Sequence, residues 1–293
     1  MSNEPSLKEN THVLSNDFRA NLFLNVSENI SNLNSVLHIH WHDSFEIIFI
    51  KEGNAIFQIG SVEYYAENGD ILFVNQGELH SGYLVNNTKV TFYAIVFDKS
   101  VLSYYIPDTQ QKKLIYPFIE GKMTFPSIVK EKSENYIAFL SFVNSIIYEF
   151  EQKKTGYEIA VKCLLSMLTL QVIRAKAYTE QIGKIYIKDN RLERFKFLFN
   201  YIEAHFPEKI TIEIAANLVN LSSYHFCKVF KKVTGKTFIE FLNLYRINEA
   251  EDLLRETDLP ITLVAEKVGF CNINYFDKIF KKYKRYSPST CRK

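Results

Sequence analysis

The sequence predicts an α+β protein of several domains, in which a β-rich N-terminal part is followed by an all-α C-terminal part. Three observations predict it: short strand-like runs between residues 36 and 98, helical periodicity from about residue 131, and a repeat with an offset of 50 residues near the C-terminus. The chain has 293 residues, of which 47% are hydrophobic, and this is enough for two domains with substantial cores.

The strand-like part contains four runs that are rich in β-branched and aromatic residues, IIFI, AIFQI, ILFV and VTFYAIVF. Turn-forming residues at 51–54, 68–70 and 86–87 separate these runs. Short strands at regular spacing are typical of a sandwich or a small barrel, so we assign residues 36–120 to a β-domain. Residues 1–35 show no clear period, and we expect an N-terminal arm there.

The next part, residues 121–182, has helical periodicity. Its apolar residues fall three or four apart, at Ile137, Leu140, Val143, Ile147 and Phe150, and again at Ile159, Cys163, Leu164, Met167 and Leu168. Two helices joined at 153–156 would form a hairpin whose apolar face packs either on the β-domain or on a second copy of the chain. The polar stretch 183–190 is expected to be a linker, and residues 191–293 to be helical.

Composition excludes several classes of protein. No apolar run reaches the length of a bilayer span, and the N-terminus MSNEPSLKEN is too polar for a signal peptide. The four cysteines are scattered without a CxxC pair, which favours reduced thiols in the cytoplasm over a disulfide framework or a zinc site. The sequence lacks a nucleophile elbow, a phosphate loop and a dinucleotide fingerprint. We therefore expect a cytoplasmic protein that is not an enzyme and uses no cofactor.

The C-terminal repeat predicts two helix-turn-helix units. Ile214-Ala215 pairs with Val264-Ala265, and the run from Phe226 to Lys232 pairs with the run from Phe276 to Lys282. In each copy a short helix carrying an alanine precedes a turn and a second helix, which begins at a good N-cap, Ser222 or Asn272. The small alanine lets two helices cross closely, as a helix-turn-helix requires.

The second helix of each unit is amphipathic. One face is apolar in both copies: Phe226, Val229, Phe230 and Val233, then Phe276, Ile279, Phe280 and Tyr283. The other is polar and basic: Tyr224, Cys227, Lys228 and Lys231, then Asn274, Asp277, Lys278 and Lys281. These spacings place each set together, and the polar face suits the major groove of DNA. An ordinary solvated helix face is the alternative, and the duplication favours DNA.

The spacer and the charge distribution agree with this prediction. Thr237–Glu256 is an uninterrupted helical pattern about 30 Å long, close to the ~34 Å between successive major grooves on one face of a duplex. Residues 190–293 contain 18 basic and 12 acidic residues, whereas residues 1–189 contain 17 and 21. A basic end on a neutral body indicates a polyanionic partner.

These residues resemble the AraC/XylS-type transcription regulators. The family's C-terminal signature has the form GFxxxxYFxxxFKKxxGxSPxxYR, and this chain has Gly269-Phe270, Tyr275-Phe276, Phe280-Lys281-Lys282, Ser287-Pro288 and Arg292 at the matching positions. Arg285 stands where the family usually has Gly, and Cys291 where it usually has Tyr or Phe. The resemblance covers the whole chain, but it is specific only over residues 190–293. It implies double-stranded promoter DNA, RNA polymerase and a small-molecule effector as partners, a homodimer, and a role as activator, with repression as an alternative.

The resemblance also implies roles for individual residues in DNA binding. Base contacts are expected from Tyr224, Cys227 and Lys228 in the first unit, and from Ile273, Asn274, Asp277 and Lys278 in the second. Ser223 is a further candidate for DNA binding. Phosphate contacts are expected from Lys231, Lys232, Lys281 and Lys282. We expect the first unit to contribute more to base recognition and the second more to electrostatic attraction.

A cluster of histidines marks the β-domain. His40-x-His42-x-x-x-Glu46 looks like the first cupin motif, and Asn75-x-Gly77-x-x-His80 looks like the second. We therefore expect a cupin-like barrel in which His38, His40, His42, Glu46 and His80 line a small-molecule site. His40, His42, Glu46 and His80 are also candidate ligands of a divalent metal.

Three functions remain open for the chain as a whole. The first is a regulator that responds to a small molecule in the cupin-like domain. The second is a constitutive DNA-binding regulator whose β-domain only dimerises. The third is a metal-dependent cupin enzyme fused to a DNA-binding domain. No residue in the sequence identifies an effector.

Overall fold

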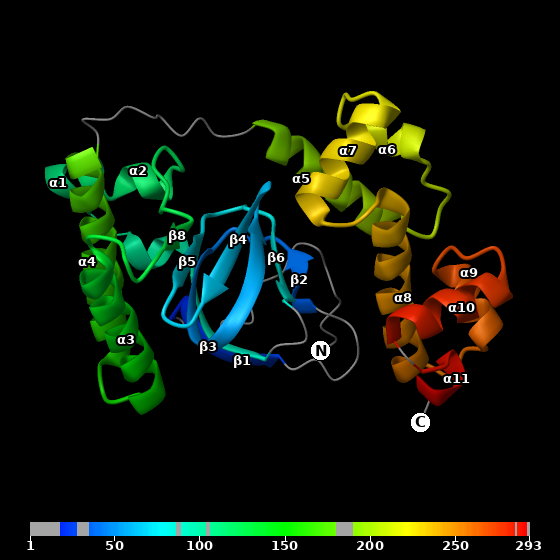
Figure 1. Cartoon of the computed structure of the whole chain (residues 1–293), viewed down its shortest axis with the longest axis horizontal. Helices are drawn as coiled ribbons and strands as arrows, with labels where there is room; N and C mark the ends of the chain where they lie inside the picture. The colour runs from blue at the N-terminus through cyan, green and yellow to red at the C-terminus, as the bar shows by residue number, and fades with distance from the viewer. Residues whose placement is uncertain are drawn as a thin grey trace.

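The fold is seen in a computed structural model, which describes residues 18–27, 35–85, 89–103, 106–179, 190–284 and 286–291. A β-barrel-like domain lies in the middle, with a helical hairpin on one side and the C-terminal helices on the other (Figure 1). The predicted α+β architecture is confirmed. The predicted linker, apart from Asn190, lies outside the described residues.

Among the described residues, eight antiparallel strands build the barrel domain around one long strand, β3. The strands are β1 (Ala20–Ser27), β2 (Ser35–His40), β3 (Phe45–Ile59), β4 (Val62–Glu67), β5 (Ile71–Val74), β6 (His80–Leu84), β7 (Val90–Phe97) and β8 (Ile128–Val129). The first half of β3 pairs with β5 and β7, and its second half pairs with β4 and β6. Strand β2 pairs with β6, which places His40 opposite His80.

Strand β3 is buried on both faces, which explains its continuous apolar run. Ile47 joins the core shared with the helical hairpin, whereas Ile48 and Ile50 join the core inside the barrel. Neighbouring residues of a strand point to opposite faces, so Glu46 lies on the same face as Ile48. A carboxylate is thereby placed at the end of the barrel core.

Strand β1 revises the expected N-terminal arm. All eight of its residues pair with β7, from Ala20 with Phe97 to Ser27 with Val90. No clear period is visible in this segment because β1 is only half-buried, and Leu24 and Val26 are exposed. Residues 20–27 therefore belong to the sheet, and the rest of the expected arm lies outside the described residues except for Phe18, Arg19 and Ser35.

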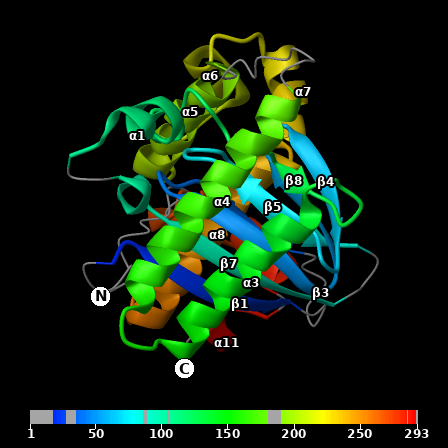
Figure 2. The same cartoon turned by 90° about the vertical axis from the view of Figure 1, so that its left-hand side faces the viewer.

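The helical hairpin covers one face of the sheet (Figure 2). Its helices are α3 (Tyr136–Gln152) and α4 (Tyr157–Thr179), and shorter helices precede them: η2 (Lys99–Leu102), α1 (Thr109–Leu114) and α2 (Tyr116–Ile119). Phe139, Val143 and Phe150 of α3 pack in one core with Phe45 and Phe73 of the sheet. The apolar face of the hairpin therefore packs on the β-domain. The prediction was wrong for four residues of the two stripes, because Ile137 (82% exposed), Ile159, Cys163 and Met167 are exposed. Helix α4 instead packs Val161, Leu165 and Leu168 into the shared core.

The C-terminal part is entirely helical within its described residues. It contains α5 (Asn190–His205), α6 (Ile212–Leu218), α7 (Ser223–Thr234), α8 (Phe238–Glu256), α9 (Ile261–Lys267), α10 (Ile273–Lys284) and α11 (Pro288–Cys291). Helix α8 is the predicted spacer, with α6 and α7 at one end and α9 and α10 at the other (Figure 1). Each pair has its own core, one around Phe226 and Phe230 and the other around Phe276 and Phe280. Within the described ranges, each helix is too short or too polar to span a membrane.

Candidate DNA-binding and ligand-binding sites

The first helix-turn-helix unit consists of α6 and α7, and each helix begins at a side-chain cap. The Thr211 hydroxyl accepts a hydrogen bond from the backbone NH of Ile214, and the Ser222 hydroxyl accepts one from His225. The alanine predicted at the helix crossing, Ala215, is fully buried. Helix α7 ends at Gly235 in the left-handed conformation, φ 69°. The start of this helix predicted at Ser222 is thus present.

The outward face of α7 carries most of the residues expected to contact DNA. Tyr224, Cys227, Lys228, Lys231 and Lys232 are exposed, and 83% of Tyr224 is accessible. Ser223 is half-buried at the first turn. The opposite face is the predicted apolar stripe, in which Phe226 and Phe230 are fully buried. The helix therefore presents one polar and basic surface to a partner.

The second unit consists of α9 and α10 and has a similar outward face. Asn272 caps α10, because its Oδ1 accepts the backbone NH of Tyr275 at 2.9 Å. Ile273, Asn274, Lys278, Lys281 and Lys282 are exposed. Asp277 is half-buried and pairs with Lys281 at 2.6 Å, so these two residues neutralise each other in the unbound chain. Arg285, the expected departure at the end of this helix, lies outside the described residues.

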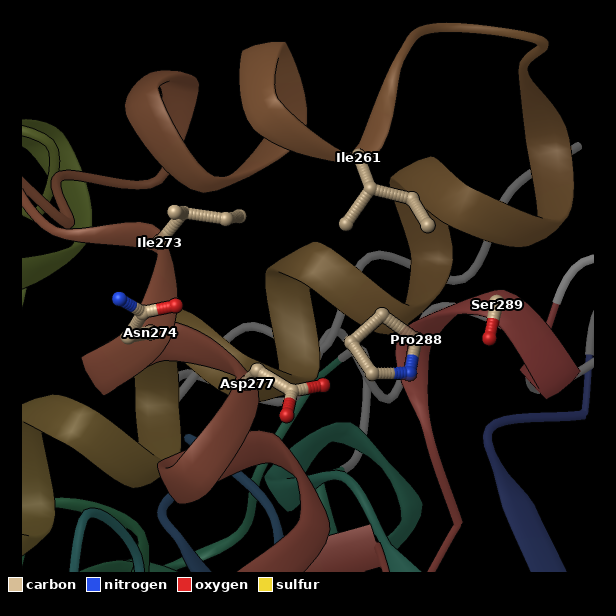
Figure 3. Close-up of a pocket in the computed structure, with 6 residues that line it drawn as sticks. All are labelled: Ile261, Ile273, Asn274, Asp277, Pro288 and Ser289. Carbon is tan, nitrogen blue, oxygen red and sulfur yellow. The ribbon is translucent and has the colours of Figure 1, made fainter.

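A small cavity opens on the outward face of the second unit. Ile273, Asn274 and Asp277 of α10 line it together with Ile261, Pro288 and Ser289 (Figure 3). Its volume is about 230 Å³. Three of the four residues expected to contact bases in this unit therefore border one recess, next to the first residue of α9.

Helix α8 fixes the position of the second unit. Its N-terminus has the capping box of Thr237 and Glu240. Further along, the side-chain amide of Asn243 donates a hydrogen bond to the Tyr275 hydroxyl of α10 at 3.0 Å. Glu251 lies near the other end and contacts Arg255, Lys284 and Tyr286. The sequence did not reveal these contacts, since nothing in the spacing links Glu251 to α10.

Four of the five candidate ligand residues of the β-domain come together in one cluster. His40, His42, Glu46 and His80 each place one potential ligand atom within 4.8 Å of the others. Nε2 of His42 and Nε2 of His80 lie 3.1 and 3.0 Å from the same Oε2 of Glu46. His42, Glu46 and His80 are buried and His40 is half-exposed. His38 is outside this group, and its backbone carbonyl contacts the His40 ring at 2.8 Å.

Burial and mutual contact shift the pKa values of the cluster. Burial alone would raise the pKa of Glu46, but the contacts of His42 and His80 with Oε2 outweigh burial and lower it. Burial lowers the pKa of His80 to about 4. At neutral pH the site therefore combines a carboxylate with imidazoles, at least one of them neutral, and this donor set fits a divalent metal.

The loop that carries His80 is fixed to the rest of the barrel. Asn75, which stands where cupins commonly have Pro, is buried, and its side chain accepts a hydrogen bond from the backbone NH of Phe125 at 2.7 Å. The backbone NH of Gly77 donates to the carbonyl of His42 at 2.7 Å. The departure at Asn75 thus provides an anchor that proline lacks.

The barrel also contacts the first helix-turn-helix unit, which the sequence did not predict. Trp41 and Leu79 are buried in the same core as Phe195 of α5 and Phe226 of α7. The Lys196 ammonium lies 5.2 Å from the centre of the Trp41 ring. From β3, the side-chain amide of Gln58 donates to the carbonyl of Lys232 at 2.6 Å. The barrel segments that carry the histidine cluster and the first helix-turn-helix unit are therefore in direct contact.

Comparisons with known proteins match both parts of the chain. Residues 34–168 match the family described as an AraC-like ligand binding domain, and residues 215–293 match a helix-turn-helix domain. The uncharacterized HTH-type transcriptional regulator YdeC of Bacillus subtilis (strain 168) is 27% identical over 269 residues, which cover 89% of this chain and 88% of that protein. The HTH-type transcriptional activator RhaS of Enterobacter sp. (strain 638) is 27% identical over 263 residues and 86% of each chain.

The chain also aligns with solved structures. ToxT from Vibrio cholerae O395 aligns over 93% of this chain and 96% of its own, with 13% identity and a TM-score of 0.43. The two matched families together account for both the histidine-bearing barrel and the paired helical units. Both belong to regulators of transcription, not to enzymes. The chain is a DNA-binding transcription regulator of the AraC family, with an AraC-like ligand-binding domain and a C-terminal helix-turn-helix domain.

Proposed function

We propose that this chain activates transcription by binding promoter DNA with both helix-turn-helix units, under the control of a small molecule bound in the barrel domain. The observation that carries the proposal is the placement of two capped helices with exposed basic faces at the two ends of α8. A rigid helix of this length suits two successive major grooves on one face of the duplex. The activator role follows the name of the relative RhaS, a transcriptional activator, and contact with RNA polymerase is the means of activation that we propose.

Individual contacts follow from exposure and position. Tyr224, Cys227 and Lys228 of the first unit, with Asn274 and Lys278 of the second, are proposed to contact base edges. The half-buried Ser223, with Ile273 and Asp277, completes this set near the helix starts. Lys231, Lys232, Lys281 and Lys282 are proposed to hold phosphates, which position the protein on the duplex.

The ligand-responsive proposal is supported by direct contact between the barrel and the first unit. Trp41 and Leu79 are neighbours in sequence of His40, His42 and His80, and they pack in the core of that unit. A ligand that binds one arrangement of these segments more tightly would shift the position of α7. In the alternative of a constitutive regulator, this contact only supports the fold.

A homodimer is proposed through the outer surface of the helical hairpin. Ile137, Tyr148, Ile159 and Met167 are exposed there, with 82% of Ile137 and 69% of Ile159 accessible. Exposed apolar side chains of this size favour a partner surface. Ile159→Asp is expected to reduce the dimer fraction in sedimentation experiments, and an unchanged fraction contradicts this dimer surface.

The proposal is tested by mapping the genomic sites that the chain occupies and titrating one such duplex. We expect Lys228→Ala and Lys278→Ala each to weaken binding to this duplex by at least ten-fold, about 1.4 kcal/mol. Lys162→Ala, an exposed lysine of α4 on the far side of the barrel, is the matched control. If no site is enriched, or if the control weakens binding equally, the proposed mode of DNA binding is wrong.

A further inference from the structure

The three histidines of the cluster are oriented by the backbone. Nδ1 of each ring contacts a carbonyl two residues away along the chain: His40 with His38 at 2.8 Å, His42 with Ser44 at 3.0 Å and His80 with Glu78 at 2.9 Å. A carbonyl oxygen accepts hydrogen bonds and cannot donate them, so Nδ1 carries the proton in each ring. In a neutral ring, Nε2 then presents a lone pair. In metal sites of proteins, a hydrogen bond from the ring nitrogen that does not bind the metal orients the histidine in the same way.

Two of these lone pairs face an oxygen that also only accepts. Nε2 of His42 and Nε2 of His80 lie 3.1 and 3.0 Å from Oε2 of Glu46. A ring with a second proton on Nε2 donates to this oxygen and stabilises the carboxylate. If both rings are neutral, acceptor faces acceptor, and these buried contacts are repulsive. One divalent cation placed among the three atoms accepts electron pairs from all of them. It also neutralises the carboxylate, which is 3% exposed.

The distances indicate the geometry of such a site. For ligand atoms about 2.1 Å from a metal, two ligands at a right angle lie about 3.0 Å apart, and two at a tetrahedral angle about 3.4 Å apart. The observed 3.0 and 3.1 Å therefore fit an octahedral arrangement. Opposite ligands of that octahedron would be about 4.2 Å apart, which agrees with the limit of 4.8 Å for all four ligand atoms. Four protein ligands would leave two positions open.

The metal-binding residues alternate with residues that dock the DNA-binding part. Trp41 lies between His40 and His42, and Leu79 directly precedes His80. Residues that are neighbours in an extended chain point to opposite sides, so the histidines face the cluster while Trp41 and Leu79 face away from it. Both are at most 5% exposed, in the core of the first helix-turn-helix unit. Fixing the histidines therefore also fixes the surface on which this unit docks.

We propose that His40, His42, Glu46 and His80 bind one six-coordinate divalent transition-metal ion, and that the bound ion strengthens DNA binding by ordering the docking surface of the first helix-turn-helix unit. The ion belongs to the class that accepts imidazole and carboxylate ligands with open positions, such as Mn²⁺, Fe²⁺, Co²⁺ or Ni²⁺. The recognition surface stays available in the docked arrangement, because 83% of Tyr224 is exposed. The effect on DNA rests on the proposed function, whereas metal binding does not.

Metal binding is measured on the full chain after removal of metal with a chelator. We expect one Co²⁺ or Mn²⁺ per chain by elemental mass spectrometry, and a weak visible cobalt spectrum of the six-coordinate type. Trp41 is the chain's single tryptophan, so quenching of its emission by Co²⁺ reports binding next to His40 and His42. An intense tetrahedral cobalt spectrum would contradict the proposed geometry, and less than 0.2 equivalents of any of these ions would contradict the site.

Variants separate the site from adventitious binding. His80→Ala and Glu46→Ala are expected to lose the ion, whereas His205→Ala should keep it. His205 is a matched control because this histidine of α5 also pairs with a carboxylate, Glu208, at 3.1 Å. His40 is half-exposed, so His40→Ala decides the outcome if the variants at buried positions fail to fold. Unchanged metal content in folded His40→Ala would overturn the assignment.

The effect on DNA is measured by titrating a mapped genomic duplex with metal-loaded and metal-free chain. We expect metal to raise the affinity at least five-fold in the natural chain and in His205→Ala, and to have no effect in His40→Ala. If metal binds but leaves the DNA affinity unchanged, the coupling is wrong. If the chain binds no specific duplex in either state while the metal is bound stoichiometrically, the proposed function fails and the metal site stands.

Discussion

Arg246, near the middle of α8, donates a hydrogen bond from Nε to the backbone carbonyl of Phe206 at 2.8 Å. A second bond, from its Nη2, reaches the carbonyl of Glu208 at 2.7 Å. The segment between these two carbonyls lies against the turn of the second helix-turn-helix unit, where Gly269 adopts φ 87°. Arg246 thus connects α8, the chain that follows α5, and the turn before α10.

This contact makes Gly269 sensitive to substitution. A Cβ at this position would lie 2.6 Å from the carbonyl oxygen of Pro207. We expect Gly269→Ala to lower the free energy of unfolding by about 2 to 4 kcal/mol, because the left-handed backbone and the clash act together. Denaturant unfolding checks this. Gly156→Ala is the control, with a similar φ of 84° and nothing within 4 Å of its Cβ, and an equal loss there would show that the clash contributes nothing.

Acid is expected to weaken the second unit through Glu251. Burial raises the pKa of Glu251, but hydrogen bonds from Lys284 and Tyr286 outweigh burial and lower it below its ordinary value. A carboxylate with a lowered pKa contributes stability above the pKa of the unfolded chain, and loses it as pH falls through the folded value. We therefore expect Glu251→Gln to reduce stability by about 1 to 3 kcal/mol at pH 7, and by progressively less below about pH 4.

The pH dependence of this variant is measured as the difference in Tm between the natural chain and Glu251→Gln at a series of pH values. Glu256→Gln serves as the control, since Glu256 is exposed at the end of the same helix. A difference that stays constant from pH 7 to pH 3 would contradict the role given to the ionised carboxylate.

We expect the lysines of α10 to make two different kinds of contact with DNA. Lys278→Ala should weaken binding to the mapped duplex more than binding to random DNA, because a base contact is lost. Lys282→Ala should weaken both equally and reduce the slope of log affinity against log salt by about 1. Fluorescence anisotropy at several salt concentrations distinguishes the two cases. Equal losses on both duplexes for Lys278→Ala would make it a phosphate contact.

The junction between barrel and first unit depends on Gln58. We expect Gln58→Leu to lower the stability of the whole chain by about 1 kcal/mol, because buried carbonyls at the end of α7 lose their donor. The emission of Trp41 should change as well, since this ring lies in the same junction. Gln152→Leu, at an exposed position of α3, is the control. An unchanged Tm together with unchanged emission would show that Gln58 does not hold the junction.

The features that were predicted correctly depend on residues that are close together in the sequence. The caps at Ser222 and Asn272, the spacer helix and the two-faced recognition helices depend on residues within one or two turns of each other. The cluster of His40, His42, Glu46 and His80 spans more chain, but strand alternation and the motif spacing were sufficient to predict it. These features are encoded over short distances, so a pattern in the sequence reveals them.

Contacts between distant segments were not predictable in this way. The pairing of β1 with β7 lacks a sequence signal, because an edge strand that is half-buried on both faces has no clear alternation. Ile137 fits the apolar stripe of its helix but is exposed, since periodicity does not show where the supporting sheet ends. Packing of Trp41 against α5 depends on how two domains meet, and neither domain's own pattern contains that information.

The hydrogen bonds from Gln58 to the end of α7 are accepted by backbone groups, not by side chains. Both are main-chain carbonyls, those of Lys232 and Val233, and every amino acid supplies such a group. The side chains on the outward face of α7 can therefore be exchanged without removing this attachment. A regulator built in this way can acquire a new operator sequence by substitution in α7 and keep the attachment of this unit to the barrel, provided that Gln58 is retained.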